Sequence, residues 1–171
     1  PCPTNDYAVS KLAMEQMAKL WIERLPLFIV RPFNYTGLGQ KEQFLVPKIV
    51  AHFRKKKSTI ELGSLDVWRE FGDVRTVVDI YRRLVEDCPL GNTLNVCTGK
   101  THSLREVISL CEKITGHNIK IQINPAFVRP NEVLMLRGSS KRLKERIGGL
   151  KPFCLEETLT WMLGNEESGL T

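Results

Sequence analysis

The chain has 171 residues, enough for one domain with a hydrophobic core but too few for two domains of ordinary size. Its content of 42% hydrophobic and 26% charged residues is ordinary for a soluble globular protein. No apolar run reaches the length of about 18 residues that a membrane-spanning helix needs, so a membrane protein is not expected. The net charge is +6, and its densest block, Arg54–Lys57, ends an apolar-periodic segment without interleaved aromatic residues. We therefore expect a solvated helix end rather than a nucleic-acid interface, while the basic balance also suits an anionic substrate such as a diphosphate.

The first residues, Pro1–Asp6, have neither the basic nor the apolar region of a signal peptide, and they lack an initiator Met. We expect the natural chain to begin further upstream. Five cysteines are scattered without a C-x-x-C pair. This spacing argues against a disulfide framework or a zinc site, so no metal is expected, and it favours reduced thiols in the cytoplasm.

Helical and extended patterns alternate along the chain. Apolar residues at helical spacing predict a first helix from Tyr7 to Arg24, with Trp21 packed in the core. The run Leu27–Val30 is typical of a strand buried on both faces, and loop chemistry follows it. The other predicted helices cover 44–56, 74–87, 103–116, 141–147 and 155–163; the other extended segments cover 59–62, 69–73, 94–97 and 119–123, with a turn at 89–92.

This alternation places the chain in the α/β class. The first strong helix has no strand before it from which to cross over. A doubly wound fold without its opening strands would look like this.

Tyr7 and Lys11 stand four residues apart and so share one face of the first helix. A lysine cation beside a tyrosine favours the phenolate, and such a tyrosine could exchange a proton with a carbonyl oxygen during hydride transfer. Taken alone, Y-x-x-x-K is more often an exposed pair on a helix surface. A second motif, Arg31–Gln40, follows the buried strand, at the carboxyl end where ligands of open α/β sheets collect.

Together these motifs carry a specific resemblance. Y-A-V-S-K-L-A-M-E, then R-P-F-N-Y-T-G-x-G-Q, L-D-V-W-R-E-F-G-D-V-R and R-P-N-E-V, resemble the extended short-chain dehydrogenase/reductase family of NAD-dependent epimerases and dehydratases. The likeness is greatest to its reductases of GDP-linked sugars, and it covers essentially the whole chain. It implies the C-terminal part of an extended Rossmann-type fold with a small α/β substrate-binding domain, the N-terminal βαβ units being absent.

The resemblance also implies roles for individual residues. Tyr7 would be the catalytic acid/base, and Lys11 would hydrogen-bond the nicotinamide ribose of NAD or NADP. Arginine side chains grip phosphate oxygens in bidentate fashion, which suits a sugar diphosphate. For Lys48, Asn95 and Glu132, structural or solvent-exposed roles remain open. The implied cofactor-binding set is Tyr7, Lys11, Pro32 and Phe33, and the implied substrate-binding set is Asn34, Lys48, Arg69, Asn95, Arg129 and Glu132.

We assign residues 1–35 to the end of the NAD(P)-binding Rossmann domain. Residues 36–171 are mainly the substrate-binding region, with about 69–100 returning to the Rossmann sheet. The expected reaction is the NAD(P)H-dependent reduction of the C4 ketone of a GDP-4-keto-6-deoxyhexose, by a homodimer formed through the Tyr7–Arg24 helix. A 4,6-dehydratase or 4-epimerase is an alternative. Because the glycine fingerprint for the dinucleotide and the upstream Ser/Thr of the family are missing, a non-catalytic substrate-binding fragment is another.

Overall fold

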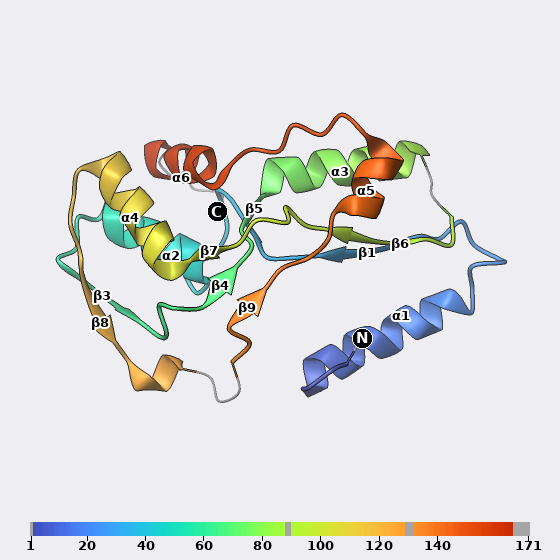
Figure 1. Cartoon of the computed structure of the whole chain (residues 1–171), viewed down its shortest axis with the longest axis horizontal. Helices are drawn as coiled ribbons and strands as arrows, with labels where there is room; N and C mark the ends of the chain where they lie inside the picture. Colours follow the sequence, from blue (N-terminus) through green and yellow to red (C-terminus); the bar gives the residue numbers. More distant parts are fainter. Residues whose placement is uncertain (1, 88–89, 129–131, 166–171) are drawn as a thin grey trace.

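The computed structural model describes residues 2–87, 90–128 and 132–165, and it has the α/β character that the sequence predicts (Figure 1). None of the helices in these ranges is both long and apolar enough to cross a membrane. Helices and strands follow one another from α1 (Asp6–Lys19) to α6 (Leu155–Gly164). They form two packed regions, one around a parallel strand pair beside α1 and one around three helices at the other end of the molecule.

The first region contains the parallel pair β1 (Ile29–Pro32) and β6 (Thr93–Val96), with Ile29 opposite Thr93 and Pro32 opposite Val96. Helices α3 (Val74–Asp87) and α5 (Lys141–Ile147) pack against it, above the pair in Figure 1. The strand β1 was predicted to be buried on both faces, but its residues are at most half-buried. The reason is that, within the described residues, β6 is its only strand partner. The buried residues of this core are Ile80, Leu84, Leu94, Val96 and Leu143.

The helix α1 lies apart from this core, below β1 and β6 in Figure 1. It begins after Asn5, whose side chain accepts a hydrogen bond from the Ala8 amide at 2.9 Å. It ends at Lys19, before the predicted end at Arg24, and it buries only Glu15. The prediction that Trp21 packs in the core is wrong, because this side chain is 48% exposed. Val9, Met14 and Met17 of α1 are exposed in this chain, while Leu12 is half-buried.

The second region is the larger core. Helices α2 (Leu45–Arg54), α4 (Leu104–Thr115) and α6 pack together with the parallel pair β3 (Thr59–Leu62) and β8 (Lys120–Ile123). As predicted, α4 begins with a capping box, in which Ser103 and Glu106 satisfy each other's backbone amides, and it ends at a left-handed glycine, Gly116. Phe53, Ile49 and Leu159 are among its fully buried side chains.

Two-residue strands join the two regions. β2 (Tyr35–Thr36) pairs in parallel with β5 (Gly72–Asp73). β4 (Trp68–Arg69) is the middle strand of a sheet, with β7 (His102–Ser103) antiparallel on one side and β9 (Met135–Leu136) parallel on the other. A single 3-10 turn, η1 (Pro125–Phe127), follows β8. Strands this short leave almost no periodicity in a sequence, and of these only the segment around β4 and β5 was predicted to be extended.

Candidate functional site

Tyr7 and Lys11 lie one turn apart near the start of α1. The Lys11 ammonium is 5.6 Å from the centre of the Tyr7 ring. Tyr7 is 72% exposed, so its hydroxyl is open to a ligand or to another protein surface. The structure therefore places a phenol and a cation side by side, as the proposed chemistry needs, while their catalytic role stays a prediction.

An ion pair fastens α1 to the strand that leads into the site. The Arg31 guanidinium donates to both carboxylate oxygens of Glu15, at 2.8 and 2.6 Å, and Lys19 lies 3.3 Å from the same carboxylate. The hydrogen bond from Arg31 is the main reason that the pKa of Glu15 lies below its usual value. Because Arg31 belongs to β1, this contact sets the position of α1 relative to the carboxyl end of that strand.

Phe33 and Asn34 form the turn between β1, which ends at Pro32, and β2. Pro32 is exposed, and Phe33 is half-buried with its amide donating to the Val96 carbonyl at 2.9 Å. The Asn34 carbonyl accepts from the Gly72 amide at 2.9 Å, which ties the turn to β5. The turn therefore holds its shape through bonds to β6 and β5, which leaves the exposed Asn34 side chain free of these backbone contacts.

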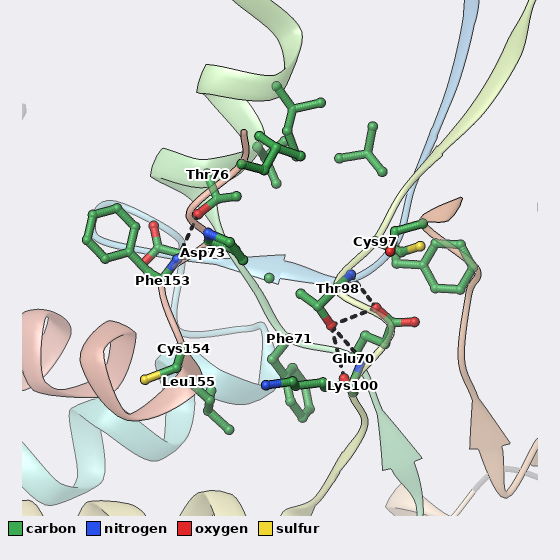
Figure 2. A pocket seen from close by; sticks show the side chains of 18 of the residues that line it. Glu70, Phe71, Asp73, Thr76, Cys97, Thr98, Lys100, Phe153, Cys154 and Leu155 are labelled. Carbon is green, nitrogen blue, oxygen red and sulfur yellow. Dashed lines mark hydrogen bonds between the residues drawn. The ribbon is translucent and has the colours of Figure 1, made fainter. Parts of the chain in front are cut away.

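Phe33 and Asn34 also line a cavity of about 690 Å³. The cavity extends from this turn along α3 towards the segment before α6, and apolar side chains cover most of its wall (Figure 2). Neither Tyr7 nor Lys11 lines it, and neither do Lys48, Arg69 and Glu132. Among the predicted site residues that the structure describes, Phe33 and Asn34 alone line this cavity.

Arg69 and Glu132 come together across β4 and β9. The Arg69 guanidinium donates to the Glu132 carboxylate at 3.3 Å, to the Trp68 carbonyl at 2.9 Å and to the Leu134 carbonyl at 3.4 Å. The two charged side chains are only 16% and 22% exposed, so this ion pair is partly shielded from water. A guanidinium held in this way keeps donors in a fixed plane, which suits an oxyanion ligand.

The other predicted substrate residues are placed differently. The Lys48 ammonium donates to the Glu61 carbonyl at 2.7 Å and lies 4.6 Å from the centre of the Phe127 ring. Asn95 lies in β6 opposite Arg31, half-buried. Arg129 lies outside the described residues. The structure therefore joins Arg69 with Glu132, leaves Lys48 engaged at the β3–η1 corner, and does not test the binding role of any of them.

Sequence reasoning missed Glu70, the residue after β4. Its side chain is 1% exposed and accepts hydrogen bonds from the Thr98 amide at 2.6 Å, the Thr98 hydroxyl at 2.8 Å, the Gly99 amide at 2.9 Å and the Gly138 amide. Figure 2 shows the carboxylate turned towards Thr98. Burial, together with the charge of Glu70, raises the pKa of the Cys97 thiol to about 11. The only sequence signal was an acidic residue inside a buried extended segment.

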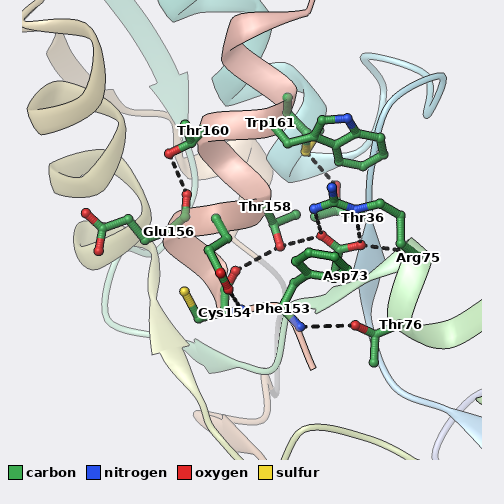
Figure 3. A network of polar contacts seen from close by, with 12 residues as sticks. Thr36, Asp73, Arg75, Thr76, Phe153, Cys154, Glu156, Thr158, Thr160 and Trp161 are labelled. Atoms are coloured by element: carbon green, nitrogen blue, oxygen red, sulfur yellow. Dashed lines mark hydrogen bonds and ion pairs between the residues drawn. The ribbon is translucent and has the colours of Figure 1, made fainter. Parts of the chain in front are cut away.

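A second buried carboxylate, Asp73, lies three residues further on (Figure 3). It accepts from the Arg75 amide at 2.8 Å, from the Arg75 guanidinium at 3.0 and 2.7 Å, and from the Thr158 hydroxyl at 2.8 Å. The guanidinium lies 3.9 Å from the ring centres of both Phe153 and Trp161. This network joins β5 and the start of α3 to α6.

Comparison with known proteins agrees with this architecture. The model of one protein family, described as GDP-mannose 4,6 dehydratase, matches residues 2–162. The chain belongs to this family. Among curated proteins, it is 38% identical to GDP-6-deoxy-D-talose 4-dehydrogenase of Aggregatibacter actinomycetemcomitans over 86% of this chain and 50% of that protein. It is 34% identical to GDP-6-deoxy-D-mannose reductase of Pseudomonas aeruginosa over 98% of this chain and 58% of that protein.

Solved structures match the fold closely. A candidate epimerase from Burkholderia cenocepacia is 51% identical, with a TM-score of 0.93 over 96% of this chain and 54% of its own. RMD from Pseudomonas aeruginosa, solved with NADPH, is 34% identical, with a TM-score of 0.87 over 96% of this chain and 57% of its own. The chain therefore spans about half the length of these relatives. The predicted family resemblance and fold class, the C-terminal part of an epimerase/dehydratase fold, are confirmed.

Proposed function

We propose that this chain is the part of a GDP-sugar oxidoreductase that binds the nucleotide sugar and supplies the proton donor. The proposed reaction is the NAD(P)H-dependent reduction of the C4 ketone of a GDP-4-keto-6-deoxyhexose. The observation that carries it is the identity above 30% to two enzymes named for GDP-6-deoxyhexose chemistry, a talose dehydrogenase and a mannose reductase. Their substrates differ at the sugar, and both names include a GDP group.

In this proposal Tyr7 donates a proton to the C4 oxygen as the ketone is reduced, and the Lys11 cation stabilises the phenolate that remains. NAD(P)H would supply the hydride. The residues present fit only the nicotinamide end of such a cofactor. Tyr7 and Lys11 offer an exposed phenol and ammonium for the ribose, and Pro32 and Phe33 lie at the carboxyl end of β1, the strand to which α1 is tied. The 171 residues contain no glycine fingerprint for the pyrophosphate.

On the substrate side, Arg69 would bind the diphosphate, with Glu132 keeping the guanidinium in place. Arg129, three residues before Glu132, would add a second guanidinium. Asn34 would reach the substrate from the exposed turn after β1. Lys48 would approach the nucleotide once its ammonium leaves the Glu61 carbonyl. Asn95 would contribute to binding the same nucleotide sugar.

Two alternatives have an observation in their favour. The matching family model is described as a dehydratase, and one similar structure as a candidate epimerase, so a 4,6-dehydratase or 4-epimerase on the same scaffold is the second candidate. A binding module without turnover is the third, because the chain spans about half of its relatives. We also propose a homodimer through α1, since Val9, Met14 and Met17 on that helix are each more than half exposed.

The test is calorimetric titration of the 171-residue chain with GDP and with UDP. We expect GDP to bind more tightly than UDP. Arg69→Lys should weaken GDP binding about tenfold, because a point charge cannot replace a planar fork. Arg105→Lys is the matched control, since Arg105 forms an exposed ion pair with Asp66. Equal binding of the two nucleotides, or no effect of Arg69→Lys, would contradict the assignment. Reduction of a GDP-4-keto-6-deoxyhexose with NADPH by the chain alone would exclude the module without turnover.

A further inference from the structure

Glu70 lies directly after the middle strand of the three-stranded sheet β7–β4–β9. It follows Arg69, the last residue of β4, and its two carboxylate oxygens point to different neighbours. One oxygen accepts from the Thr98 amide and hydroxyl and from the Gly99 amide, in the loop that leads into β7. The other accepts from the Gly138 amide, just after β9. A single side chain thus links both flanking strands at the end of the middle strand.

Gly138, the residue that Glu70 bonds after β9, also contacts the turn after β1. At Gly138 an added Cβ would lie 2.6 Å from the Phe33 ring and 2.8 Å from the Cys97 sulfur, so only glycine fits there without displacing them. The Gly138 backbone is therefore packed directly against the Phe33 ring. The hydrogen bond from the Gly138 amide to Glu70 fixes the position of this backbone, and the backbone in turn limits where the Phe33 ring can lie.

The segment that leads into β9 also contains the partner of Arg69. Glu132 lies three residues before β9, and the Leu134 carbonyl accepts both from the Trp68 amide at 2.7 Å and from the Arg69 guanidinium at 3.4 Å. Moving β9 away from β4 would therefore disturb the Arg69 guanidinium at one end of β9 and the Phe33 ring at the other.

We propose that Glu70 is a positioning residue, which fixes the Arg69–Glu132 pair relative to the turn that carries Phe33 and Asn34. The inference rests on the proposed function, in which Arg69 holds the diphosphate and Phe33 lies beside the reacting end of the cofactor. Glu70 does not touch substrate in this scheme. Its oxygens are already occupied by four donors, three of them backbone amides whose places depend on the chain around them.

Glu70→Gln tests the carboxylate with little change in volume. Glutamine keeps one acceptor oxygen but presents an NH₂ group where the second oxygen was, so a donor would face either the Gly138 amide or the Thr98 loop. We expect the loop that loses its acceptor to separate from β4, with the Arg69 guanidinium leaving its present plane.

Asp73→Asn is the matched control. Asp73 has the same 1% exposure as Glu70 and also accepts four hydrogen bonds, but its donors belong to Arg75 and Thr158, and none of them lies in the loops beside β7 and β9. A merely structural role for Glu70 predicts that the two variants behave alike. A positioning role predicts similar losses of thermal stability and different losses of ligand affinity.

The experiment titrates the 171-residue chain and both variants with GDP and with GMP. We expect Glu70→Gln to weaken GDP binding about tenfold and GMP binding less than about twofold, because the second phosphate is the part that a displaced Arg69 would lose. Asp73→Asn should change neither affinity by more than about twofold. Amide hydrogen exchange without ligand should accelerate at Thr98, Gly99 or Gly138 in Glu70→Gln alone.

The outcomes separate the two proposals. Absence of GDP binding by the unmodified chain would overturn the proposed function, and the role of Glu70 with it. GDP binding that Glu70→Gln leaves unchanged, or that Asp73→Asn weakens equally, would overturn the role of Glu70 only. If Glu70→Gln does not fold, Thr98→Val removes one of the four hydrogen bonds and keeps both amides of the loop. It should then reduce the preference for GDP over GMP about threefold, and an unchanged preference would refute the inference.

Discussion

Asp73→Asn tests what holds β5 and α3 against α6. The carboxylate is buried and accepts three hydrogen bonds from Arg75 and one from Thr158, whose side chain is fully buried. Asparagine fills the same space but carries no charge, and its NH₂ group must face a donor. We therefore expect the β5–α3 corner to lose stability while the fold is retained.

The size of the effect follows from these bonds. Hydrogen bonds to a charged group contribute about 1.5–3 kcal/mol, against about 0.5–1.5 kcal/mol for neutral ones, so neutralising the two bonds to the Arg75 guanidinium costs about 2 kcal/mol. A donor that loses its acceptor adds about 1 kcal/mol or more. We expect a loss of about 2–4 kcal/mol at pH 7, measured by urea unfolding followed by circular dichroism. For a chain of this size, the melting temperature should fall by roughly 5–15 °C.

The pH dependence gives a second test of the same substitution. Burial disfavours the charge on Asp73, but hydrogen bonds from Arg75 and Thr158 outweigh it, so the pKa of this carboxyl lies below its ordinary value. A group whose pKa is depressed by folding stabilises the protein fully above its unfolded pKa, about 3.9, and loses that contribution as the pH falls through the folded pKa. The stability difference between the two proteins should be constant from pH 7 to about pH 5 and shrink below about pH 4.

A difference in unfolding free energy below about 1 kcal/mol at pH 7, or one independent of pH, would refute this reasoning. Asp66→Asn, on an exposed ion pair, should leave the unfolding midpoint unchanged.

Two further predictions concern the contacts around the site. Glu15→Gln should loosen α1 and accelerate tryptic cleavage within this helix several-fold. Glu23→Gln, at an exposed position just after α1, should leave the cleavage rate unchanged. Equal cleavage rates in the two variants would contradict the role of the hydrogen bond to Arg31. Burial raises the pKa of the Cys97 thiol to about 11, so iodoacetamide at pH 8 should label Cys97 much more slowly than the exposed Cys154. Peptide mass spectrometry measures the two labelling rates. Comparable rates would contradict the burial of Cys97.

The sequence predicted the elements whose signals are local. The capping residues Ser103 and Glu106 and the left-handed Gly116 mark the ends of α4 in any surroundings, and α4 is found where they place it. The burial of β1 and the place of Trp21 were predicted wrongly, because burial depends on what packs against an element. The helix α1 has apolar residues at helical spacing, but a spacing pattern does not say which surface will cover it.

The site divides in the same way. The pairing of Tyr7 with Lys11 follows from helical geometry, and Figure 1 adds only where their helix lies. The contact of Arg69 with Glu132 joins residues far apart in the sequence, and spacing alone could not predict it. Glu70 was missed for the same reason. Its four hydrogen-bond donors come from two loops that are distant in the sequence, and no motif near Glu70 indicates that they will meet it.

These contacts converge on three consecutive residues at the carboxyl end of β1. Arg31 holds α1, and therefore Tyr7, through its ion pair with Glu15. Phe33, two residues further on, packs against the Gly138 backbone, which a hydrogen bond to Glu70 holds next to the end of β4. The proposed proton donor and the proposed diphosphate-binding arginine thus lie on separate elements. The stretch between Arg31 and Phe33 contacts α1 on one side and the Gly138 backbone on the other. Pro32, the last residue of β1, lies between these two contacts, and its ring fixes the backbone φ at that position.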